Sequence, residues 1–405
     1  MRNSRIYPVA LIVGLCGACS AVLTLASSQW AERIAANEDF ARVRAVVDAF
    51  GLLSDGMERD EVVATYTRAV SPARVGDMSY YEVRRDGELL GYGLPVAGRG
   101  RYGPIKGVLA LGASKRTILA LRIHEQHETP GLGGRIASSQ WLSQFSGRSV
   151  AHAGTRGLVF HNWAGGPNVI RPVTCASMTM RSVSLMLNRA IAQFLAGGRA
   201  LAVLDLGLRA DAISMPTPEP PKVAPPHLRG LTARPPFLVP AGGTVNLARG
   251  KPVTSSTPVP ATGELEQLTD GCIKSGVFDY VELGRGPQWV QVDLGAEHTV
   301  YAVALWHGYQ KAPIYNDVIV QASSDAEFGR DVRTLFNNDH DNSSGLGTGT
   351  DPAYIAWWWA ELVDARGPAN EGTPCRYVRV WTNQGWAGEE TRFVEIRVYG
   401  RPNVE

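Results

Sequence analysis

The hydrophobic residues at the start of the chain form one uninterrupted stretch. Residues Tyr7 to Ser27 contain no charged side chain, and Arg2 and Arg5 precede them. A helix of this length, rising 1.5 Å per residue, reaches about 31 Å and can cross the hydrocarbon core of a bilayer. Positive charges before such a stretch favour a cytoplasmic N-terminus. The pattern therefore predicts a single-pass anchor over residues 1–29 in the cytoplasmic membrane, with the bulk of the chain on the extracytoplasmic side.

Two other interpretations of this segment stay open. Positive charge, an apolar stretch and small residues are also typical of a cleaved signal peptide. Cys16 and Cys19 allow a lipoprotein, although the residues before them make poor lipidation signals. We favour the retained anchor, because the apolar stretch is long for a signal peptide and no clean small-x-small cleavage site follows it before Trp30.

The next part of the chain mixes helical and strand patterns. Apolar residues at spacings of three and four predict amphipathic helices over Trp30–Leu53 and Thr179–Ala196. Asp86-Gly87 lies between two alternating stretches and predicts a hairpin. The mixture predicts an α+β domain over residues 30–210. Its expected strands are Tyr80–Val83, Leu89–Tyr92, Val108–Leu111 and Ile118–Ile123.

A proline-rich segment follows. Nine prolines lie between Met215 and Pro240, which predicts a stiff, extended linker over residues 211–243 that separates its neighbours by tens of ångströms. Beyond Asn246, short β-type stretches alternate with turn residues and predict an all-β sandwich over residues 244–405. The expected strands are Gln288–Leu294, Val300–Leu305, Asp317–Ala322, Arg376–Val380 and Val394–Tyr399.

Charge and cysteine content add two constraints. Lys and Arg number 40 against 38 Asp and Glu, and no basic block stands out, so we expect no nucleic-acid partner. Five cysteines are present, and Cys272 and Cys375 share the predicted sandwich. They could form a disulfide in an oxidising compartment, or both could remain free thiols.

A glycine-rich loop after the strand Ile118–Ile123 carries the most specific motif. Residues 124–134 read HEQHETPGLGG, and Trp141 follows. Glycines let the backbone approach a flat or phosphorylated ligand, although most such loops only turn the chain. The order of residues resembles the FMN-binding domain of the NqrC protein of the sodium-translocating NADH:quinone reductase and of the RnfG protein of the related Rnf complex. The resemblance covers about residues 5–200, including Gly103-Pro104 and Gly165-Gly166. It implies that FMN contacts Glu128, Thr129, Gly131, Leu132 and Gly133.

The same resemblance implies an attachment point for the flavin. In that family a hydroxyl in a Ser/Thr-Gly-Ala-Thr motif carries FMN through a phosphoester. The matching stretch here is Thr174-Cys175-Ala176-Ser177, which places Ser177 at the attachment position, with Thr179 as the nearest alternative. A helix from Thr179 would direct the positive end of its dipole at the phosphate.

Three residues depart from the family motif. Cys175 replaces the glycine and adds a Cβ where the backbone would adopt a positive φ or approach a neighbour closely. Ser177 replaces threonine, and Ile170 stands where the family has an acidic residue. Covalent FMN, noncovalent flavin and a flavin-free domain therefore all remain open. If these departures limit attachment, Cys175→Gly combined with Ile170→Asp should raise flavin occupancy.

The C-terminal motifs resemble the discoidin, or coagulation factor 5/8 type C, domain, a galactose-binding-like jelly roll. The resemblance rests on residues 246–253, 268–271, 289–295, 376–381 and 393–400. It implies a ligand that is a glycan, a lipid or a protein. Many relatives bind Ca²⁺, which here would be held by Asp270, the Gly271 backbone and Glu395. An ordinary Asp-Gly turn is the alternative. Trp357, Trp358 and Trp359 could stack on a sugar or belong to the core.

These features predict a membrane-anchored FMN electron-transfer protein that works with other subunits of a respiratory redox complex rather than as a stand-alone enzyme. The sandwich would bind a glycan or an envelope protein. A flavin-free adhesion or scaffold protein and a carbohydrate-recognition protein with a vestigial first domain are the rival hypotheses. His124, His127, His152 and His161 show no metal-binding spacing, so we expect surface or loop roles for them.

Overall fold

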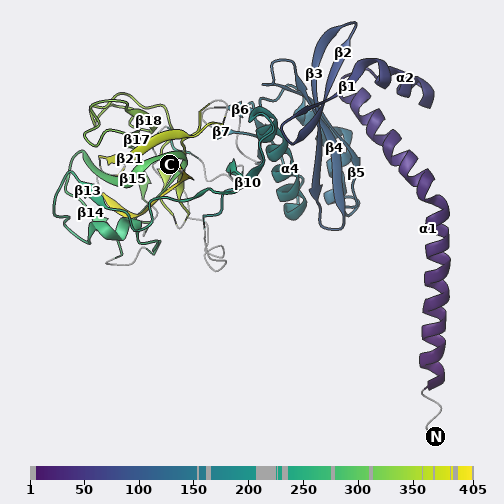
Figure 1. The fold of residues 1–405 in the computed structure, drawn as a ribbon, viewed down its shortest axis with the longest axis horizontal. Helices are drawn as coiled ribbons and strands as arrows, with labels where there is room; N and C mark the ends of the chain where they lie inside the picture. The colour runs from purple at the N-terminus through teal and green to yellow at the C-terminus, as the bar shows by residue number, and fades with distance from the viewer. Residues whose placement is uncertain are drawn as a thin grey trace. The chain divides into compact units, whose positions relative to one another are not determined.

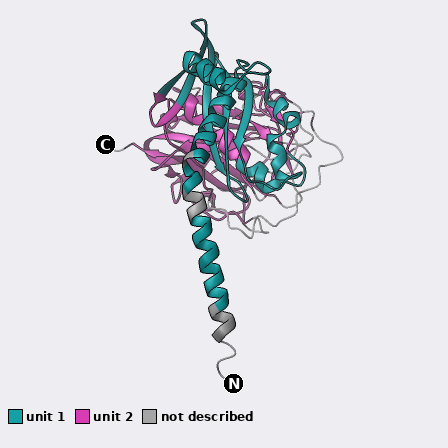
Figure 2. Cartoon of the chain, turned by 90° about the vertical axis from the view of Figure 1, so that its right-hand side faces the viewer, with its two compact units in different colours: residues 1–73, 80–147, 173–182 teal, residues 74–79, 148–172, 183–405 magenta. Residues whose placement is uncertain are grey.

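The chain folds into two compact units, each described here by itself. Unit 1 comprises Met1–Ala73, Tyr80–Gly147 and Val173–Ser182, and unit 2 comprises Arg74–Ser79, Arg148–Pro172 and Val183–Glu405 (Figure 2). The segment predicted as one α+β domain therefore contributes to both units. The computed structural model describes residues 6–152, 155–160, 166–206, 225, 227–229, 236–274, 279–309, 313–357, 359–367, 370–383, 385 and 391–403.

Helix α1 (Ile6–Ala49) is continuous over 44 residues (Figure 1). The predicted anchor and the predicted helix from Trp30 are thus one element, since neither glycine nor proline separates them. Its stretch Leu11–Ala31 has a mean hydropathy of 1.9 and is not buried, so by length and composition it could cross a membrane. A signal sequence would meet the same criterion.

The last turns of α1 pack on a five-stranded sheet. Its strands follow chain order as neighbours, and β2 to β5 are antiparallel. The predicted hairpin is confirmed, since Asp86 and Gly87 take φ values of 52° and 87° between β2 and β3. Val46 of α1 and Phe50, which directly follows the helix, are buried against β4 and β5. The elements are α2 (Arg59–Ala69), β1 (Val70–Val75), β2 (Met78–Arg85), β3 (Glu88–Arg99), β4 (Pro104–Gly112) and β5 (Ile118–Glu125).

Short elements connect this sheet to a second long helix. Helix α4 (Ser177–Leu195) begins two residues before the predicted start at Thr179. In unit 2, Asn188 on α4 bonds both backbone groups of Leu158, accepting from its N–H at 2.6 Å and donating to its carbonyl at 3.1 Å. The connecting elements are η1 (Gly133–Ala137), α3 (Ser139–Leu142), η2 (Ser143–Phe145), β6 (Ala151–His152), β7 (Thr155–Arg156), β8 (Val159–Phe160) and β9 (Val169–Ile170).

A nine-stranded sheet that folds on itself forms the sandwich in unit 2. Strand β15 (Gln288–His307) includes two of the predicted strands and changes register between Asp293 and His298, where Gly295 has a φ of 89°. Its first part pairs with β13, and its second part pairs with β20 and β22. The other strands of the sheet are β12 (Val245–Asn246), β13 (Val253–Ser255), β14 (Val281–Glu282), β17 (Val318–Ser323), β18 (Arg333–Asn337), β20 (Glu361–Asp364), β21 (Thr373–Thr382) and β22 (Arg392–Pro402).

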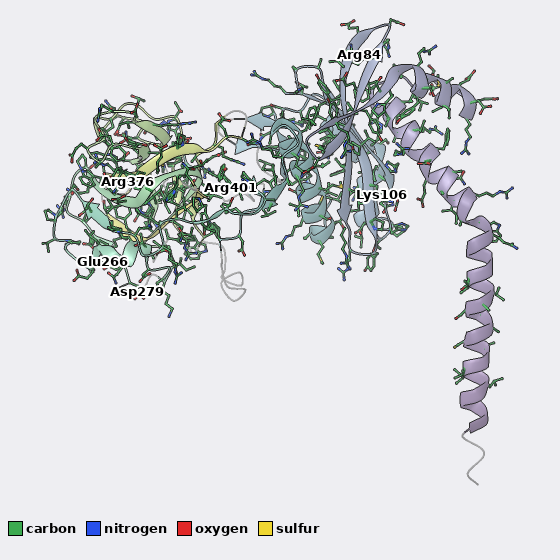
Figure 3. All side chains as sticks on the ribbon, viewed as in Figure 1. Arg84, Lys106, Glu266, Asp279, Arg376 and Arg401 are labelled. Carbon is green, nitrogen blue, oxygen red and sulfur yellow. The ribbon has the colours of Figure 1, made fainter. Side chains whose placement is uncertain are left out.

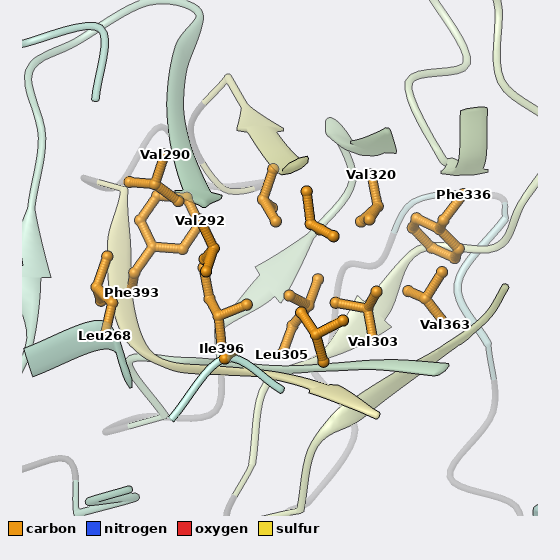
Figure 4. Close-up of a cluster of buried hydrophobic side chains, with 14 of the residues drawn as sticks. Leu268, Val290, Val292, Val303, Leu305, Val320, Phe336, Val363, Phe393 and Ile396 are labelled. Atoms are coloured by element: carbon orange, nitrogen blue, oxygen red, sulfur yellow. The ribbon is translucent and has the colours of Figure 1, made fainter. Parts of the chain in front are cut away.

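The core of this sandwich is mostly aliphatic, with aromatic rings such as Phe336 and Phe393 among its members. Side chains from both parts of β15 meet there, including the fully buried Val292 and Val303 (Figure 4). Alternate residues of a strand point to opposite faces, and β15 bends between its two parts. The inward-facing residues of both parts therefore point into the same core, and one strand contributes to both layers. The remaining elements of the region are η4 (Leu265–Thr269) and a separate pair, β16 (Ile314–Tyr315) with β19 (Tyr354–Ile355).

The proline-rich segment differs from its prediction. Strand β10 (Leu201–Val203), which precedes the segment, pairs with β11 (Leu238–Pro240) near its end, so the chain returns to the place where it left. The expected extended spacer is therefore wrong, because proline stiffens the chain locally but does not fix where its ends lie. Most of the residues between the two strands lie outside the described part of the chain.

Arginines hold the described parts of this segment on the sandwich. Arg229 forms an ion pair with buried Glu361 at 2.7 Å, and Arg366 lies 4.1 Å from the ring centre of Phe237. Arg401 donates to the carbonyls of Ala241 and Gly242 at 2.8 and 2.7 Å (Figure 3).

The two cysteines of the sandwich are free thiols. Cys272 is exposed, whereas Cys375 on β21 is buried. Burial raises the pKa of the Cys375 thiol to about 12.

Candidate functional site

The candidate flavin site lies where three segments of unit 1 meet at the buried carboxylate of Glu128. Oε1 of Glu128 accepts the backbone N–H of Arg101 at 2.6 Å and that of Tyr102 at 3.3 Å. Oε2 accepts the hydroxyl of Thr179 in the first turn of α4. Only 5% of Glu128 is exposed. One side chain therefore ties the turn after β3, the loop after β5 and the start of α4 together.

Glycines make room for this carboxylate. A Cβ on Gly100 would collide with Oε1 of Glu128. A Cβ on Gly133 would lie 2.8 Å from Oε2 and 2.7 Å from the hydroxyl oxygen of Thr179. Real Cβ atoms do not approach other atoms so closely, so both positions require glycine in this arrangement.

The predicted glycine-rich loop folds into a compact turn. The carbonyl of Thr129 accepts the N–H groups of Leu132 at 3.2 Å and Gly134 at 3.0 Å. Gly131 has a φ of 75°, a conformation that favours glycine. Thr129, Gly131 and Leu132 are exposed, whereas Gly133 is buried beside Glu128.

The predicted attachment stretch forms a turn at the start of α4. Cys175 has a φ of 60°, which confirms that its backbone adopts the conformation expected of the glycine it replaces. Thr174, Cys175 and Ser177 are exposed, and Ala176 is buried. Ser177 is the first residue of the helix, so its hydroxyl lies where unpaired backbone N–H groups attract anions.

The two candidate attachment hydroxyls differ in environment. Thr179 is 3% exposed and its hydroxyl donates to Glu128. Ser177 is exposed to solvent. Thr179 is therefore engaged in the contacts around Glu128, whereas the hydroxyl of Ser177 stays accessible to a ligand.

Three large side chains next to these contacts are exposed. Tyr102, Leu132 and Met178 expose 61%, 45% and 65% of their surface, and each comes from a different one of the three segments tied by Glu128. Flat aromatic groups bind to such apolar side chains. The residues present therefore fit FMN in two respects: an accessible hydroxyl at a helix N-terminus for the phosphate, and exposed apolar side chains beside it for the ring system.

The histidines of the glycine-rich loop take peripheral places. His127 is exposed, with Nε2 3.8 Å from Glu125. Burial lowers the pKa of half-buried His124. The side chain of His152 and all of His161 lie outside the described residues.

The predicted calcium residues of the sandwich are close to an arginine. Glu395 on β22 is fully buried, and its Oε1 accepts Nε of Arg397 at 2.9 Å. Its Oε2 accepts the N–H of Gly271 at 3.2 Å, and Oδ1 of Asp270 accepts the N–H of Cys272 at 2.6 Å. Burial raises the pKa of Glu395 to about 7, because desolvation outweighs the opposing effect of Arg397.

Two other side-chain groups of the sandwich bear on its chemistry. Among the described residues, Asp317, Asp339 and Asp341 bring carboxylate oxygens within 4.8 Å of one another. Burial and the repulsion of Asp339 and Asp341 raise the pKa of Asp317 to about 7. The half-buried rings of Trp357 and Trp359 lie 6.5 Å apart, and Trp358 falls outside the described residues.

Comparisons with known proteins match the part of the chain that contains the first site. The sequence model of a family described as FMN-binding domain matches residues 100–192, a range that includes Glu128 and Ser177. The chain is 44% identical over 57 residues to the NqrC protein of the Na(+)-translocating NADH-quinone reductase of Chlamydia caviae, covering 14% of this chain and 18% of that protein. It is 30% identical over 129 residues to the RnfG protein of the ion-translocating oxidoreductase complex of Cereibacter sphaeroides, covering 31% of this chain and 57% of that protein. The chain thus spans less than two thirds of the length of these relatives.

Solved structures resemble parts of the chain. The NqrC protein of the Na(+)-translocating NADH-quinone reductase of Parabacteroides distasonis gives a TM-score of 0.35 at 18% identity, covering 38% of this chain and 89% of that one. Chitosan-binding module 1 of a chitosanase/glucanase from Paenibacillus sp. IK-5 gives a TM-score of 0.27 at 23% identity, covering 38% and 99%. TM-scores this low support no conclusion about function or ligand.

Sequence reasoning missed several residues of both sites. Arg101 and Tyr102 contribute backbone N–H groups, which almost any residue type could supply, so the sequence does not identify them. The Gly100-x-x-Gly103 spacing does indicate the tight turn that holds these two N–H groups. Met178 lies before the predicted helix start at Thr179, so the helical pattern did not include it. Arg397 had a visible signal, because residues two apart on a strand share a face and Glu395 lies at that spacing.

Proposed function

We propose that this chain is a membrane-anchored electron-transfer protein that carries FMN as a phosphoester on Ser177. The observation that carries the proposal is the division of roles between the two hydroxyls at the start of α4. Thr179 is buried and donates to Glu128, while Ser177 is exposed at the helix N-terminus. The match of residues 100–192 to an FMN-binding domain supports the same ligand.

The residues of the site would divide the work of holding the flavin. Ser177 Oγ would form the phosphoester bond, displacing AMP from a flavin adenine dinucleotide donor and losing its proton to solvent. Backbone N–H groups of the first turn of α4 would face the phosphate, and Tyr102, Leu132 and Met178 would lie beside the ring system. FMN, when bound, supplies the one- and two-electron chemistry, and the chain positions it.

The relatives also suggest where the protein works. The matched proteins are named as subunits of ion-translocating oxidoreductases, so we assign this chain to a membrane redox complex with partner subunits. The helix α1 would anchor it, with Arg2 and Arg5 inside and the remaining chain outside the cytoplasm.

The test of the flavin assignment is a fluorescent band after denaturing electrophoresis. The full chain is expressed with a flavin transferase, and flavin-bearing peptides are mapped by mass spectrometry. We expect Ser177→Ala to remove the covalent flavin and Ser177→Thr to retain it. Thr179→Ser keeps a hydroxyl for Glu128 and serves as the matched control. A flavin mass on residue 179 would assign the attachment to the other hydroxyl.

Topology is tested with exposed Cys272. A membrane-impermeant maleimide should label this thiol in intact spheroplasts. Because Cys175 is also exposed, the labelled peptide is identified by mass spectrometry, and Cys272→Ser should remove the label from the Cys272 peptide. Labelling that appears only after lysis would place the sandwich inside the cell.

For the sandwich we propose binding to an envelope glycan. Tyr309, Trp357 and Trp359 form a chain of edge-to-face rings with centres 6.3 and 6.5 Å apart, and aromatic rings of this kind stack on sugars. Retention of the full chain on immobilised envelope polysaccharide should fall in Trp359→Ala. Equal retention of the variant would favour a protein ligand that binds elsewhere on the module.

A further inference from the structure

Arg397 is the centre of a dense group of contacts in unit 2. Its Nε donates to Oε1 of Glu395 at 2.9 Å, its Nη2 to the carbonyl of Gly271 at 2.9 Å, and its Nη1 to the carbonyl of Leu206 at 2.6 Å. Its Cζ lies 4.8 Å from the ring centre of Trp306. Only 9% of the residue is exposed, so this guanidinium is fixed from several sides.

These contacts involve the oxygens that the sequence assigned to a calcium ion. The Gly271 carbonyl and Oε1 of Glu395 accept from Arg397, and Oε2 of Glu395 accepts from the backbone of Gly271. Oδ1 of Asp270 accepts the N–H of Cys272. A second guanidinium is also close, because a Cβ added to Gly271 would collide with Nη1 of Arg249.

This arrangement does not fit a calcium ion. Ca²⁺ takes six to eight oxygen ligands at about 2.3–2.6 Å, and the ligands must converge on one point. Here Oε1 of Glu395 and the Gly271 carbonyl converge on the cationic guanidinium of Arg397, while Oε2 of Glu395 and Oδ1 of Asp270 accept backbone N–H groups. Binding Ca²⁺ would require Arg397 to leave both Glu395 and the face of Trp306, and the ion would then lie close to Arg249.

We infer that the guanidinium of Arg397 takes the place of a metal ion and makes the Asp270–Gly271 turn independent of calcium. A guanidinium suits this task because it donates several hydrogen bonds in one plane. It also reaches Leu206, so the same cation fastens the stretch that precedes the proline-rich segment to β22. Arg397 thereby connects these parts of the sandwich without a bound metal ion.

The experiment compares thermal unfolding of the full chain in chelator and in millimolar CaCl₂, at pH 8, followed by tryptophan fluorescence. We expect the wild-type midpoint to be the same in both conditions. Arg397→Ala leaves Glu395 buried without its cation, so its midpoint in chelator should fall. Millimolar Ca²⁺ should then recover part of that loss, because the freed oxygens become available.

Two variants keep the test decisive if Arg397→Ala does not fold. Arg397→Lys retains the charge but loses the planar fork, so its midpoint should be lowered and should stay insensitive to Ca²⁺. If wild type responds to Ca²⁺, Asp270→Asn and Asp341→Asn locate the ion. A response that Asp270→Asn abolishes overturns the inference. A response that only Asp341→Asn abolishes supports it, because the Gly271 turn then contributes no ligand.

Discussion

Each unit contains a buried glutamate that joins segments distant in sequence, but the two use different donors. Glu128 accepts from two backbone N–H groups and one hydroxyl, all of which are neutral. Glu395 accepts from the guanidinium of Arg397 and from one backbone N–H. The first carboxylate organises loops around an accessible surface, and the second closes a packed interior.

The difference shows how the same side chain serves binding in one place and stability in another. Neutral donors stabilise a carboxylate without filling the space next to it with a second long side chain. That leaves Ser177 and the exposed side chains of Tyr102, Leu132 and Met178 accessible to a ligand. An arginine instead fills its surroundings, and both carboxylate oxygens of Glu395 already accept hydrogen bonds, from Arg397 and from Gly271.

The largest loss of stability is expected from breaking the ion pair between Glu395 and Arg397. Glu395→Ala leaves the guanidinium of Arg397 buried without its carboxylate, which typically costs about 3–5 kcal/mol. We expect the free energy of unfolding of the full chain, measured in urea at pH 8, to fall by that amount. The pH lies above the value of about 7 to which burial raises the pKa of Glu395, so the wild-type pair is ionised.

The matched control for this variant is Glu266→Ala. Glu266 is exposed on η4 (Figure 3), and exposed substitutions of this kind usually change stability by less than about 0.5 kcal/mol. If the two variants lose equal stability, the pair with Arg397 contributes nothing to the sandwich.

A smaller but more local effect is expected at Glu128. Glu128→Ala leaves the N–H groups of Arg101 and Tyr102 and the hydroxyl of Thr179 without their acceptor. Unsatisfied groups of this kind cost about 1–3 kcal/mol each when buried, and water will satisfy some of them, so we expect a total near 2 kcal/mol. Hydrogen exchange should accelerate at these two amides, and flavin occupancy should drop.

Glu125→Ala is the comparison for that variant, since Glu125 pairs with partly exposed Lys106 and such pairs contribute about 0–1 kcal/mol. Glu128→Gln keeps one acceptor oxygen and should recover part of the protection. Unchanged exchange at Arg101 and Tyr102 in Glu128→Ala would show that the carboxylate does not hold the turn.

The sequence predicted the local elements of the site better than the buried contacts of Glu128 that hold those elements together. The Asp86-Gly87 hairpin, the strands around it and the positive φ at Cys175 all follow from local residue preferences. Burial of Glu128 does not, because it depends on a turn 27 residues away in the chain. A charged residue in a polar stretch gives no sign that it will become the centre of a packed junction.

Tertiary pairing also changed two larger expectations. Strand β10, before the proline-rich segment, pairs with β11 near the end of that segment, a contact that composition does not encode. Ile170 is fully buried, so the repair Ile170→Asp would place a carboxylate in the core and should destabilise the fold rather than raise flavin occupancy. Only the Cys175 part of that repair remains a useful test.

Asp317 offers the reverse comparison, because other carboxylates rather than hydrogen-bond donors dominate its surroundings. The pKa of Asp317 is raised from 3.8 to about 7 by burial and by Asp339 and Asp341, so the folded state binds its proton more tightly than the unfolded state. The group favours folding below about pH 4, and this contribution is lost as the pH rises toward 7. Asp317→Asn should therefore gain stability over wild type as the pH rises from 5 to 8, by about 1–2 kcal/mol because the acids titrate together.

Urea unfolding at both pH values measures that gain. Asp341→Asn removes one of the neighbouring charges from an exposed position and should give a smaller gain in the same direction. A pH-independent difference between Asp317→Asn and wild type would mean that Asp317 is ionised throughout this range.

The smallest effect is expected at Cys175, where the flavin site departs from the glycine of the related motif. Its φ of 60° costs a residue with a Cβ about 1 kcal/mol, so Cys175→Gly should raise the free energy of unfolding by less than that, because glycine also loses more backbone entropy on folding. Flavin occupancy should rise with it, since Ser177 follows two residues later in the same turn. Cys175→Ala removes the sulfur but keeps the Cβ, so it separates backbone strain from thiol chemistry. If Cys175→Ala raises flavin occupancy as much as Cys175→Gly does, the sulfur rather than the strained turn limits attachment. The site around Glu128 would then tolerate the positive φ of a residue that carries a Cβ.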